Sequence, residues 1–255
     1  MDLGLQGARA LVGGGSGGLG GAVADALTGE GVRVALVARA SDRLTDRAAA
    51  LAGLAVPANL STADGPAAAV AVTVDTLGGL DLVLVNSGGP PPGRFEDLSD
   101  ADWQRAIDGT LWSAVRLIRA ATPHLRQSER PAILIILSSS VREPISGLTT
   151  SNLLRPGLAG LLKSLVAELA PIRINGLAPG RLATDRIAQL DAARAATAGL
   201  SVNEVRRQMI ERIPLGRYGD PAELGRVGAF LLSPAASYVT GAIVPVDGGL
   251  IRALP

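Results

Sequence analysis

The stretch Gly13-Gly14-Gly15-Ser16-Gly17-Gly18-Leu19-Gly20 follows an apolar run at residues 8–12 and opens a helical pattern that continues to Leu27. Glycine adopts positive φ angles and, lacking a Cβ, lets the backbone lie close to a ligand. The start of a helix presents unpaired amides and partial positive charge, a combination that suits a pyrophosphate. A strand, a glycine turn and a helix in this order predict a dinucleotide-binding unit; the alternative is a plain glycine-rich turn.

The composition of the chain limits the possible classes of protein. Its 255 residues favour a single domain over the whole range 1–255, and its net charge of +1 gives no basis for binding nucleic acid or a membrane surface. The absence of cysteine excludes disulfides, thiolate catalysis and cysteine-ligated metals, and we predict no metal site. Because the sequence contains neither a signal-like segment nor an apolar run of membrane-spanning length, we expect a soluble, cytoplasmic protein.

The second apolar run bears on the choice of cofactor. Residues 33–38 predict a buried strand that ends at Arg39, and Arg43 follows closely. In dinucleotide-binding folds an acidic residue near this place binds the ribose 2′-hydroxyl, whereas an arginine accommodates a 2′-phosphate. Since neither Ala38 nor Arg39 is acidic, we predict NADP(H) in preference to NAD(H). The alternative for Arg39 is a solvated loop charge.

Further apolar runs alternate with helical patterns along the chain. We predict strands at 54–57, 81–85, 133–137, 174–178 and 242–246, and helices at 41–51, 63–77, 100–125, 151–169 and 220–232. The continuous apolar character of these strands is typical of a parallel sheet buried on both faces. Residues 188–212 predict a mobile helical flap over the site.

Polar side chains stand where several predicted strands end. Ser138-Ser139-Ser140 follows one strand and Asn86-Ser87-Gly88 follows another. Open α/β sheets bind ligands at the carboxyl ends of their strands, so both segments are candidate site residues. Asn59 is placed either to contact an adenine edge or to form a simple turn. His124, the only histidine, is interpreted as a surface residue at a helix end.

Several ordered blocks resemble the short-chain dehydrogenase/reductase family over essentially the whole chain. They are Gly13–Gly20, similar to the TGxxxGxG turn with Gly13 in place of threonine; Val85–Gly88, at the NNAG motif; Arg173–Gly180, at the sixth strand and its Pro-Gly loop; and Ser233–Gly241 with Val246–Gly249, at the closing strand and turn. The resemblance implies a single-domain, Rossmann-like, doubly wound parallel sheet of about seven strands with helices on both faces. It also implies a nicotinamide cofactor and a homotetramer or homodimer.

The same resemblance assigns a cofactor-binding set. Its members are Gly14, Ser16, Gly18, Leu19, Gly20, Arg39, Asn59, Leu60, Asn86, Ser87, Gly88, Arg155, Pro179, Gly180, Leu182 and Thr184.

The catalytic positions depart from the family pattern. The tyrosine and lysine of the family's Tyr-x-x-x-Lys fall on Ser151 and Arg155, and its asparagine falls on Thr110. The active-site serine is retained as Ser139. The resemblance therefore implies a catalytic set of Ser139, Ser151, Arg155 and Thr110. The only tyrosines, Tyr218 and Tyr238, lie in other blocks.

The substitutions change what the site can do. A serine hydroxyl is shorter and much less acidic than a phenol, and arginine stays charged, so it can hold a ribose or an anion but cannot shuttle protons. We predict hydride transfer between NADP(H) and a carbonyl or alcohol substrate, with Ser151, Ser139, water or the substrate itself as the altered proton donor. A carboxylate or phosphate on the substrate would suit Arg155 or Arg142.

Two other hypotheses stay open. One is a catalytically impaired relative that binds the dinucleotide as a sensor or partner subunit. The other is a different reaction on the same fold, such as dehalogenation or isomerisation. Substrate selectivity is expected to lie in residues 90–95, 142–149 and 188–212.

Overall fold

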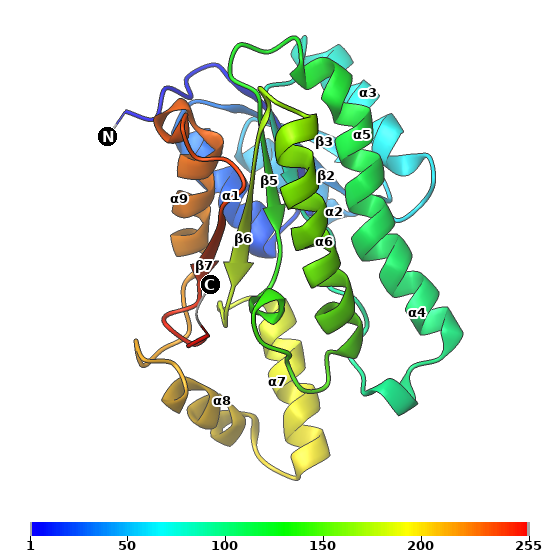
Figure 1. The fold of residues 1–255 in the computed structure, drawn as a ribbon, viewed down its shortest axis with the longest axis vertical. Coiled ribbons are helices and arrows are strands. Elements are labelled where there is room, and N and C mark those ends of the chain that lie inside the picture. The colour runs from blue at the N-terminus through cyan, green and yellow to red at the C-terminus, as the bar shows by residue number, and fades with distance from the viewer. Residues whose placement is uncertain (1, 254–255) are drawn as a thin grey trace.

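The structure, a computed structural model, describes residues 2–253 and contains one seven-stranded parallel sheet (Figure 1). The strands are β1 (Arg9–Gly13), β2 (Arg33–Ala38), β3 (Leu54–Pro57), β4 (Leu82–Val85), β5 (Ala132–Ile136), β6 (Arg173–Pro179) and β7 (Ile243–Val246). Their order is β3-β2-β1-β4-β5-β6-β7. The direction of strand addition reverses between β1 and β4, which is where doubly wound sheets form their ligand crevice. The predicted fold class is confirmed.

Helices cover both faces of the sheet (Figure 1). They are α1 (Gly18–Gly29), α2 (Asp42–Ala50), α3 (Gly65–Leu77), α4 (Asp100–Ala106), α5 (Ser113–Leu125), α6 (Thr149–Glu168), α7 (Asp185–Ala198), α8 (Val202–Glu211) and α9 (Pro221–Leu232). Side chains of α1, α2 and α9 share one apolar cluster with the sheet, and those of α3, α5 and α6 share the other. Neighbouring strand residues such as Leu11 and Val12 belong to opposite clusters, as the alternation of a pleated strand requires.

The predicted helix at 100–125 is present, but it is not regular. Between α4 and α5, residues Ile107–Trp112 form a wider π-type turn. The carbonyl oxygen of Gly109 in this turn accepts hydrogen bonds from the hydroxyls of Ser87 and Ser113. Turns of this type often occur at functional sites, and here the wide turn contains the buried Thr110.

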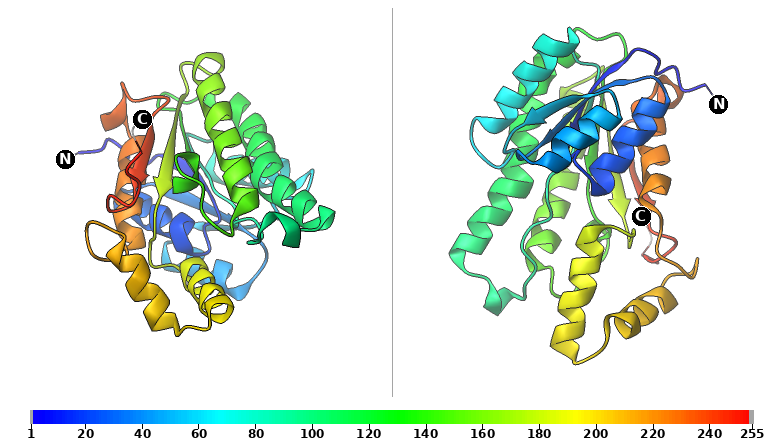
Figure 2. Two further views of the ribbon diagram at one scale, coloured as in Figure 1. Left: turned by 60° about the horizontal axis from the view of Figure 1, so that its bottom comes forward. Right: turned by 180° about the vertical axis from the view of Figure 1, so that it is seen from behind.

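The predicted flap consists of α7 and α8, which lie beyond the carboxyl ends of the strands (Figures 1 and 2). Val205 and Met209 of α8 pack with Ala195 of α7 and with Tyr218 in a small apolar cluster separate from the two main ones. The buried Asp191 of α7 accepts a 2.8 Å hydrogen bond from the Tyr218 hydroxyl and pairs with Arg181. Most of 188–212 is therefore helical, and its role as a mobile flap over the site stays a prediction.

An ion pair lies at the opposite, amino-terminal end of the sheet. Arg9 at the start of β1 donates from Nε and Nη2 to the carboxylate of Asp81, at 2.9 and 2.8 Å. The Asp81 carboxylate also accepts from the Arg9 amide and the Ser128 hydroxyl. Within residues 2–253, none of the helices is long and apolar enough to cross a membrane.

Candidate active site

A large cleft opens at the carboxyl ends of the strands, bounded by the glycine turn, the loops after β2, β4, β5 and β6, and the helices α6 and α7. Its volume of about 1900 Å³ exceeds the roughly 300–1,000 Å³ typical of a site for one small molecule. Every residue predicted to bind the cofactor lines this cleft except Gly20, and so do all four predicted catalytic residues. The cleft therefore has room for a dinucleotide and a substrate side by side.

The glycine turn is shaped by close backbone packing. Gly14 has a positive φ of 64°, and a Cβ there would lie 2.5 Å from the side-chain Nδ2 of Asn86. That Asn86 side chain donates a 3.1 Å hydrogen bond to the carbonyl oxygen of Gly13. Gly20 has a different role from the one predicted, because a Cβ on it would overlap the carbonyl oxygens of Gly13 and Gly14. It lets α1 pack on the turn and does not line the cleft.

The start of α1 fits a pyrophosphate group. Gly17 precedes the helix and offers no side-chain cap, and no acidic residue lies in the first turn. Gly18 is exposed at a φ of 55°, and a Cβ there would meet no atom within 4 Å. The first helical amides are thus open to the cleft and carry the positive end of the helix dipole.

The side chains that follow β2 and β3 differ in their hydrogen-bond and ion-pair partners. Arg39 is exposed, whereas the Nε of Arg43 donates a 3.0 Å hydrogen bond to the Ser16 carbonyl oxygen. The other end of the Arg43 guanidinium pairs with Asp185 at 2.9 Å, so Arg43 lies over the turn. The Asn59 side-chain oxygen accepts from the amide and hydroxyl of Ser61, which is the turn that the alternative interpretation proposed.

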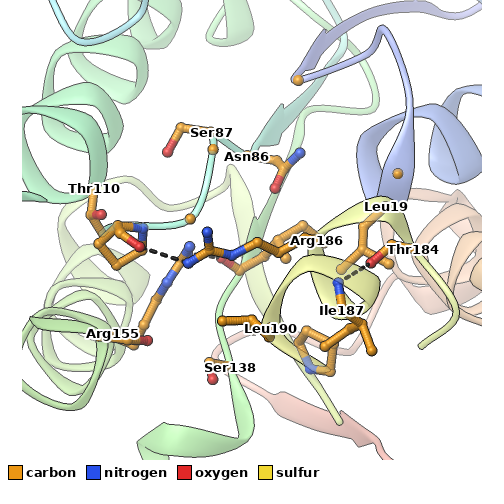
Figure 3. Close-up of a pocket in the computed structure, with 18 of the residues that line it drawn as sticks. Leu19, Asn86, Ser87, Thr110, Ser138, Arg155, Thr184, Arg186, Ile187 and Leu190 are labelled. Carbon is orange, nitrogen blue, oxygen red and sulfur yellow. Dashed lines mark hydrogen bonds between the residues drawn. The ribbon is translucent and has the colours of Figure 1, made fainter. Parts of the chain in front are cut away.

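The predicted catalytic residues all line the cleft and come from three segments; Figure 3 shows two of them, Thr110 and Arg155. Ser139 lies in the turn after β5, Ser151 and Arg155 lie one turn apart on α6, and Thr110 lies in the wide turn before α5. All four side chains are buried. The Ser151 hydroxyl is 3.3 Å from that of Ser140, and the Thr110 hydroxyl has no hydrogen-bond partner within residues 2–253.

Two arginines meet in the same part of the cleft (Figure 3). Arg155 is only 7% exposed, and its Nη1 donates to the carbonyl oxygen of Ile136 at the end of β5. Arg186, at the start of α7, donates a 2.7 Å hydrogen bond from Nη2 to the carbonyl oxygen of Pro90. Burial, and to a smaller extent the charge of Arg186, lowers the pKa of Arg155 to about 10. Burial also lowers the pKa of Arg186.

Neither tyrosine lines the cleft in the described part of the chain. The Tyr218 hydroxyl is held between Asp191 and the Nε of Arg181, which lies 3.1 Å away. Burial and the hydrogen bond to Asp191 raise the pKa of Tyr218, so it is a weaker acid than a free phenol. Tyr238 is fully exposed.

Other predictions from the sequence have mixed outcomes. His124 is half-buried near the end of α5 and lies outside the cleft. Arg142 is exposed and also does not line the cleft. Two of the predicted selectivity segments pair with each other, because the Gly93 amide donates to the Gly147 carbonyl oxygen at 2.8 Å and Gly93 bridges to Leu148.

Arg186 was missed by reasoning from the sequence. It lies two residues after Thr184, a predicted cofactor contact, at the start of a predicted helical segment. Its proximity to the cleft could have been inferred from that spacing. Its approach to Arg155 could not, because the two residues belong to different elements.

The fold and cleft together define a Rossmann-like dinucleotide-binding protein of the oxidoreductase class. A sequence model described as enoyl-(acyl carrier protein) reductase matches residues 14–251. The chain is 31% identical to the 3-oxoacyl-[acyl-carrier-protein] reductase FabG of Staphylococcus aureus, over 94% of this chain and 97% of that one. It belongs to the short-chain dehydrogenase/reductase family, whose members are NAD(P)(H)-dependent oxidoreductases of carbonyl and alcohol substrates.

The chain is also similar to solved structures of oxidoreductases. The L-sorbose reductase of Gluconobacter frateurii, complexed with NADPH and L-sorbose, has a TM-score of 0.94 at 29% identity, covering 100% of both chains. An NADPH-bound short-chain oxidoreductase of Pseudomonas aeruginosa PAO1, described as containing an atypical catalytic center, has a TM-score of 0.87 at 29% identity and covers 97% of this chain and 98% of that one.

Proposed function

We propose that this protein transfers a hydride between NADP(H) and a carbonyl or alcohol substrate without a tyrosine as the proton donor. The observation that carries this proposal is the composition of the cleft. It contains Ser139, Ser151 and Arg155 in the same cleft as the glycine turn, while both tyrosines lie elsewhere in the described structure. A solved NADPH-bound relative with an atypical catalytic center supports it.

The preference for NADP(H) depends on the cations near the end of β2. Arg43 already lies over the glycine turn, and Arg39 lines the same part of the cleft. Both could approach a 2′-phosphate, and neither Ala38 nor Arg39 offers the carboxylate that a 2′-hydroxyl would need. The further contacts would come from the predicted cofactor set, with the loop of Pro179, Gly180 and Thr184 beside the nicotinamide end.

The nicotinamide, when bound, supplies or accepts the hydride. The residues of this chain would position the substrate and manage its charge. Arg155 stays cationic at neutral pH and can stabilise a developing oxyanion, but it cannot donate the proton. The proton would come from Ser151 or Ser139, from a water held between them, or from the substrate. Loss of a well-placed general acid costs about 10²–10⁴-fold in rate, so slow turnover is expected.

Two measurements test this proposal. NADPH and NADH are titrated by fluorescence, and a set of ketones and aldehydes is screened for loss of the absorbance of the reduced nicotinamide. We expect tighter binding of NADPH and slow turnover of some carbonyl compounds. The double variant Ser151→Tyr, Arg155→Lys is expected to gain activity, because it restores the phenol and lysine of the family. Absence of binding to either nucleotide would overturn the proposal.

A second candidate is a relative that binds the dinucleotide without turnover. The absence of tyrosine from the described lining of the cleft favours it. Tight NADPH binding, no turnover of any carbonyl compound, and activity only in the double variant would establish this second function in place of the first.

Assembly into a homodimer or homotetramer is part of the proposal. The apolar side chains of Phe95, Trp112 and Leu153 are exposed in the single chain, at 73%, 40% and 61%. Large exposed apolar side chains of this kind are common at subunit contacts. Light scattering after size-exclusion chromatography should give a mass two or four times that of the chain.

A further inference from the structure

We infer that Arg155 and Arg186 form an anion subsite, which binds a carboxylate carried by the substrate close to its reacting carbonyl group. The inference rests on the proposed function and specifies its substrate class. The two guanidinium groups face the same part of the cleft, next to Thr110 (Figure 3).

Neither guanidinium is neutralised by the protein. No carboxylate within residues 2–253 pairs with Arg155 or Arg186, although other arginines of the chain form such pairs. Glu143 lines the same cleft and makes no ion pair with either arginine. Their hydrogen bonds go to two backbone carbonyl oxygens, of Ile136 and Pro90. Two adjacent cations, one of them buried, are costly to maintain unless an anion joins them.

Local structure holds the Arg186 guanidinium in place. A Cβ on Gly89 would lie 3.1 Å from the Nε of Arg186, so the missing side chain lets the guanidinium lie against the backbone of the loop after β4. The Pro90 carbonyl oxygen then accepts from its Nη2. One of the five N–H groups of this guanidinium is used in that bond, which leaves further donors for a ligand.

The position favours the substrate over the cofactor as the source of the anion. The pyrophosphate is expected at the start of α1, where the open amides lie. Arg155 instead lies one helical turn from Ser151 and donates a hydrogen bond to Ile136 at the end of β5. It is therefore near the residues expected to face the reacting carbonyl. A guanidinium binds a carboxylate through two parallel hydrogen bonds, so this arrangement suits a 2-oxo or 3-oxo acid.

The test uses a pair of matched small ligands, oxamate and its neutral amide oxamide. Binding to the wild-type protein is measured by calorimetry, with and without saturating NADP⁺. We expect oxamate to bind at least tenfold more tightly than oxamide. Arg186→Gln and Arg155→Gln should each weaken oxamate binding by about 10–100-fold, the loss of a charged hydrogen bond of about 1.5–3 kcal/mol. Arg186→Lys should recover part of the loss.

Arg119→Gln is the control, because this exposed arginine of α5 does not line the cleft. Its oxamate affinity should equal that of the wild type. If Arg155→Gln does not fold, the inference is tested with Arg186→Gln alone, because Arg186 is only half-buried. Equal binding of oxamate and oxamide would overturn the inference, and so would a loss of NADPH affinity in Arg186→Gln without a loss of oxamate affinity.

The two proposals can fail separately. The ligands are also titrated into the protein without nucleotide. Lack of NADPH binding together with selective oxamate binding would refute the proposed function and leave the anion subsite. NADPH-dependent turnover of carbonyl compounds without selective oxamate binding would do the reverse.

Discussion

Each end of the sheet contains an arginine that is buried or half-buried, but only the one at the amino-terminal end is paired with a carboxylate. At the amino-terminal end, Arg9 is paired with an Asp81 side chain that is 6% exposed and accepts hydrogen bonds from Arg9 and Ser128. At the carboxyl end, Arg155 is more deeply buried than Arg9, and its hydrogen-bond partner within the described residues is one carbonyl oxygen. The first arrangement is satisfied within the protein, and the second has unused donors that face a cleft.

The difference has an energetic meaning. Although burial raises the pKa of Asp81, its hydrogen bonds with Arg9 and Ser128 lower it overall, so the charged form is favoured by folding. For Arg155, burial lowers the pKa from its usual value to about 10, which corresponds to a cost of roughly 3 kcal/mol for the charged form. One end of the sheet therefore contributes to stability, and the other gives up stability for a binding site.

The largest effect is expected from Asp81→Ala. This change leaves the Arg9 guanidinium without its carboxylate. Because Arg9 is 27% exposed, the cost should lie at the low end of that for breaking a buried pair, about 3 kcal/mol. The Tm should fall by roughly 6–12 °C in a chain of this size. Urea unfolding followed by circular dichroism measures the loss, and NADPH affinity, measured at a temperature where the variant is folded, should stay the same. A loss of NADPH affinity at that temperature would mean that the two ends are coupled.

Acidification should weaken the same end of the sheet. Since the folded-state pKa of Asp81 is depressed, its contribution is fully present above the unfolded value of about 3.9 and is lost as the pH falls through the folded-state pKa. The free energy of unfolding should therefore drop more steeply below about pH 4 in the wild type than in Asp81→Asn. Parallel pH profiles of the two proteins would contradict this prediction.

Arg155→Met should change stability in the opposite direction. It removes the roughly 3 kcal/mol cost of the buried charge but leaves the Ile136 carbonyl oxygen without its donor, at a cost of about 1–2 kcal/mol. A net gain of about 1–2 kcal/mol is expected, together with loss of turnover. Denaturant unfolding and a carbonyl reduction assay measure the two effects. A less stable variant would show that Arg155 serves the fold as Arg9 does.

Much of the fold could be predicted because its signals are local. The apolar runs at 33–38 and 54–57 coincide with β2 and β3. In β2 the four residues 34–37 are buried, as expected for a strand covered on both faces, whereas β3 is a half-buried edge strand whose run is short but still apolar. The Ser41 cap of α2 and Pro221 at the first position of α9 are likewise fixed by neighbouring residues. The wide turn at Ile107–Trp112 could not be predicted, because its apolar residues keep a spacing that also fits a regular helix.

Part of the site could also be predicted from the sequence, namely the residues that line the cleft. Residues in the glycine turn and after the strands follow from the rule that ligands bind at the carboxyl ends, and they line the cleft as expected. Gly20 was predicted to bind the cofactor, but it packs against the Gly14 carbonyl oxygen. That contact exists only once the turn has folded. The approach of Arg186 to Arg155 is likewise a property of the tertiary structure, because α6 and α7 are separated by β6.

The smallest effect is expected from Ser151→Ala, and it sharpens the comparison at the carboxyl end. The contact of Ser151 with the Ser140 hydroxyl is 3.3 Å long, beyond the usual 2.5–3.0 Å for two hydroxyls, so its loss should cost less than about 1 kcal/mol. A serine hydroxyl is too short and too weakly acidic to replace a phenol, and a water that enters the cleft can supply the proton instead. The kcat should therefore fall by about tenfold or less, with Ser140→Ala as the matched control. A fall of about 10²–10⁴-fold would instead identify Ser151 as the proton donor and show that the hydroxyl reaches the substrate directly.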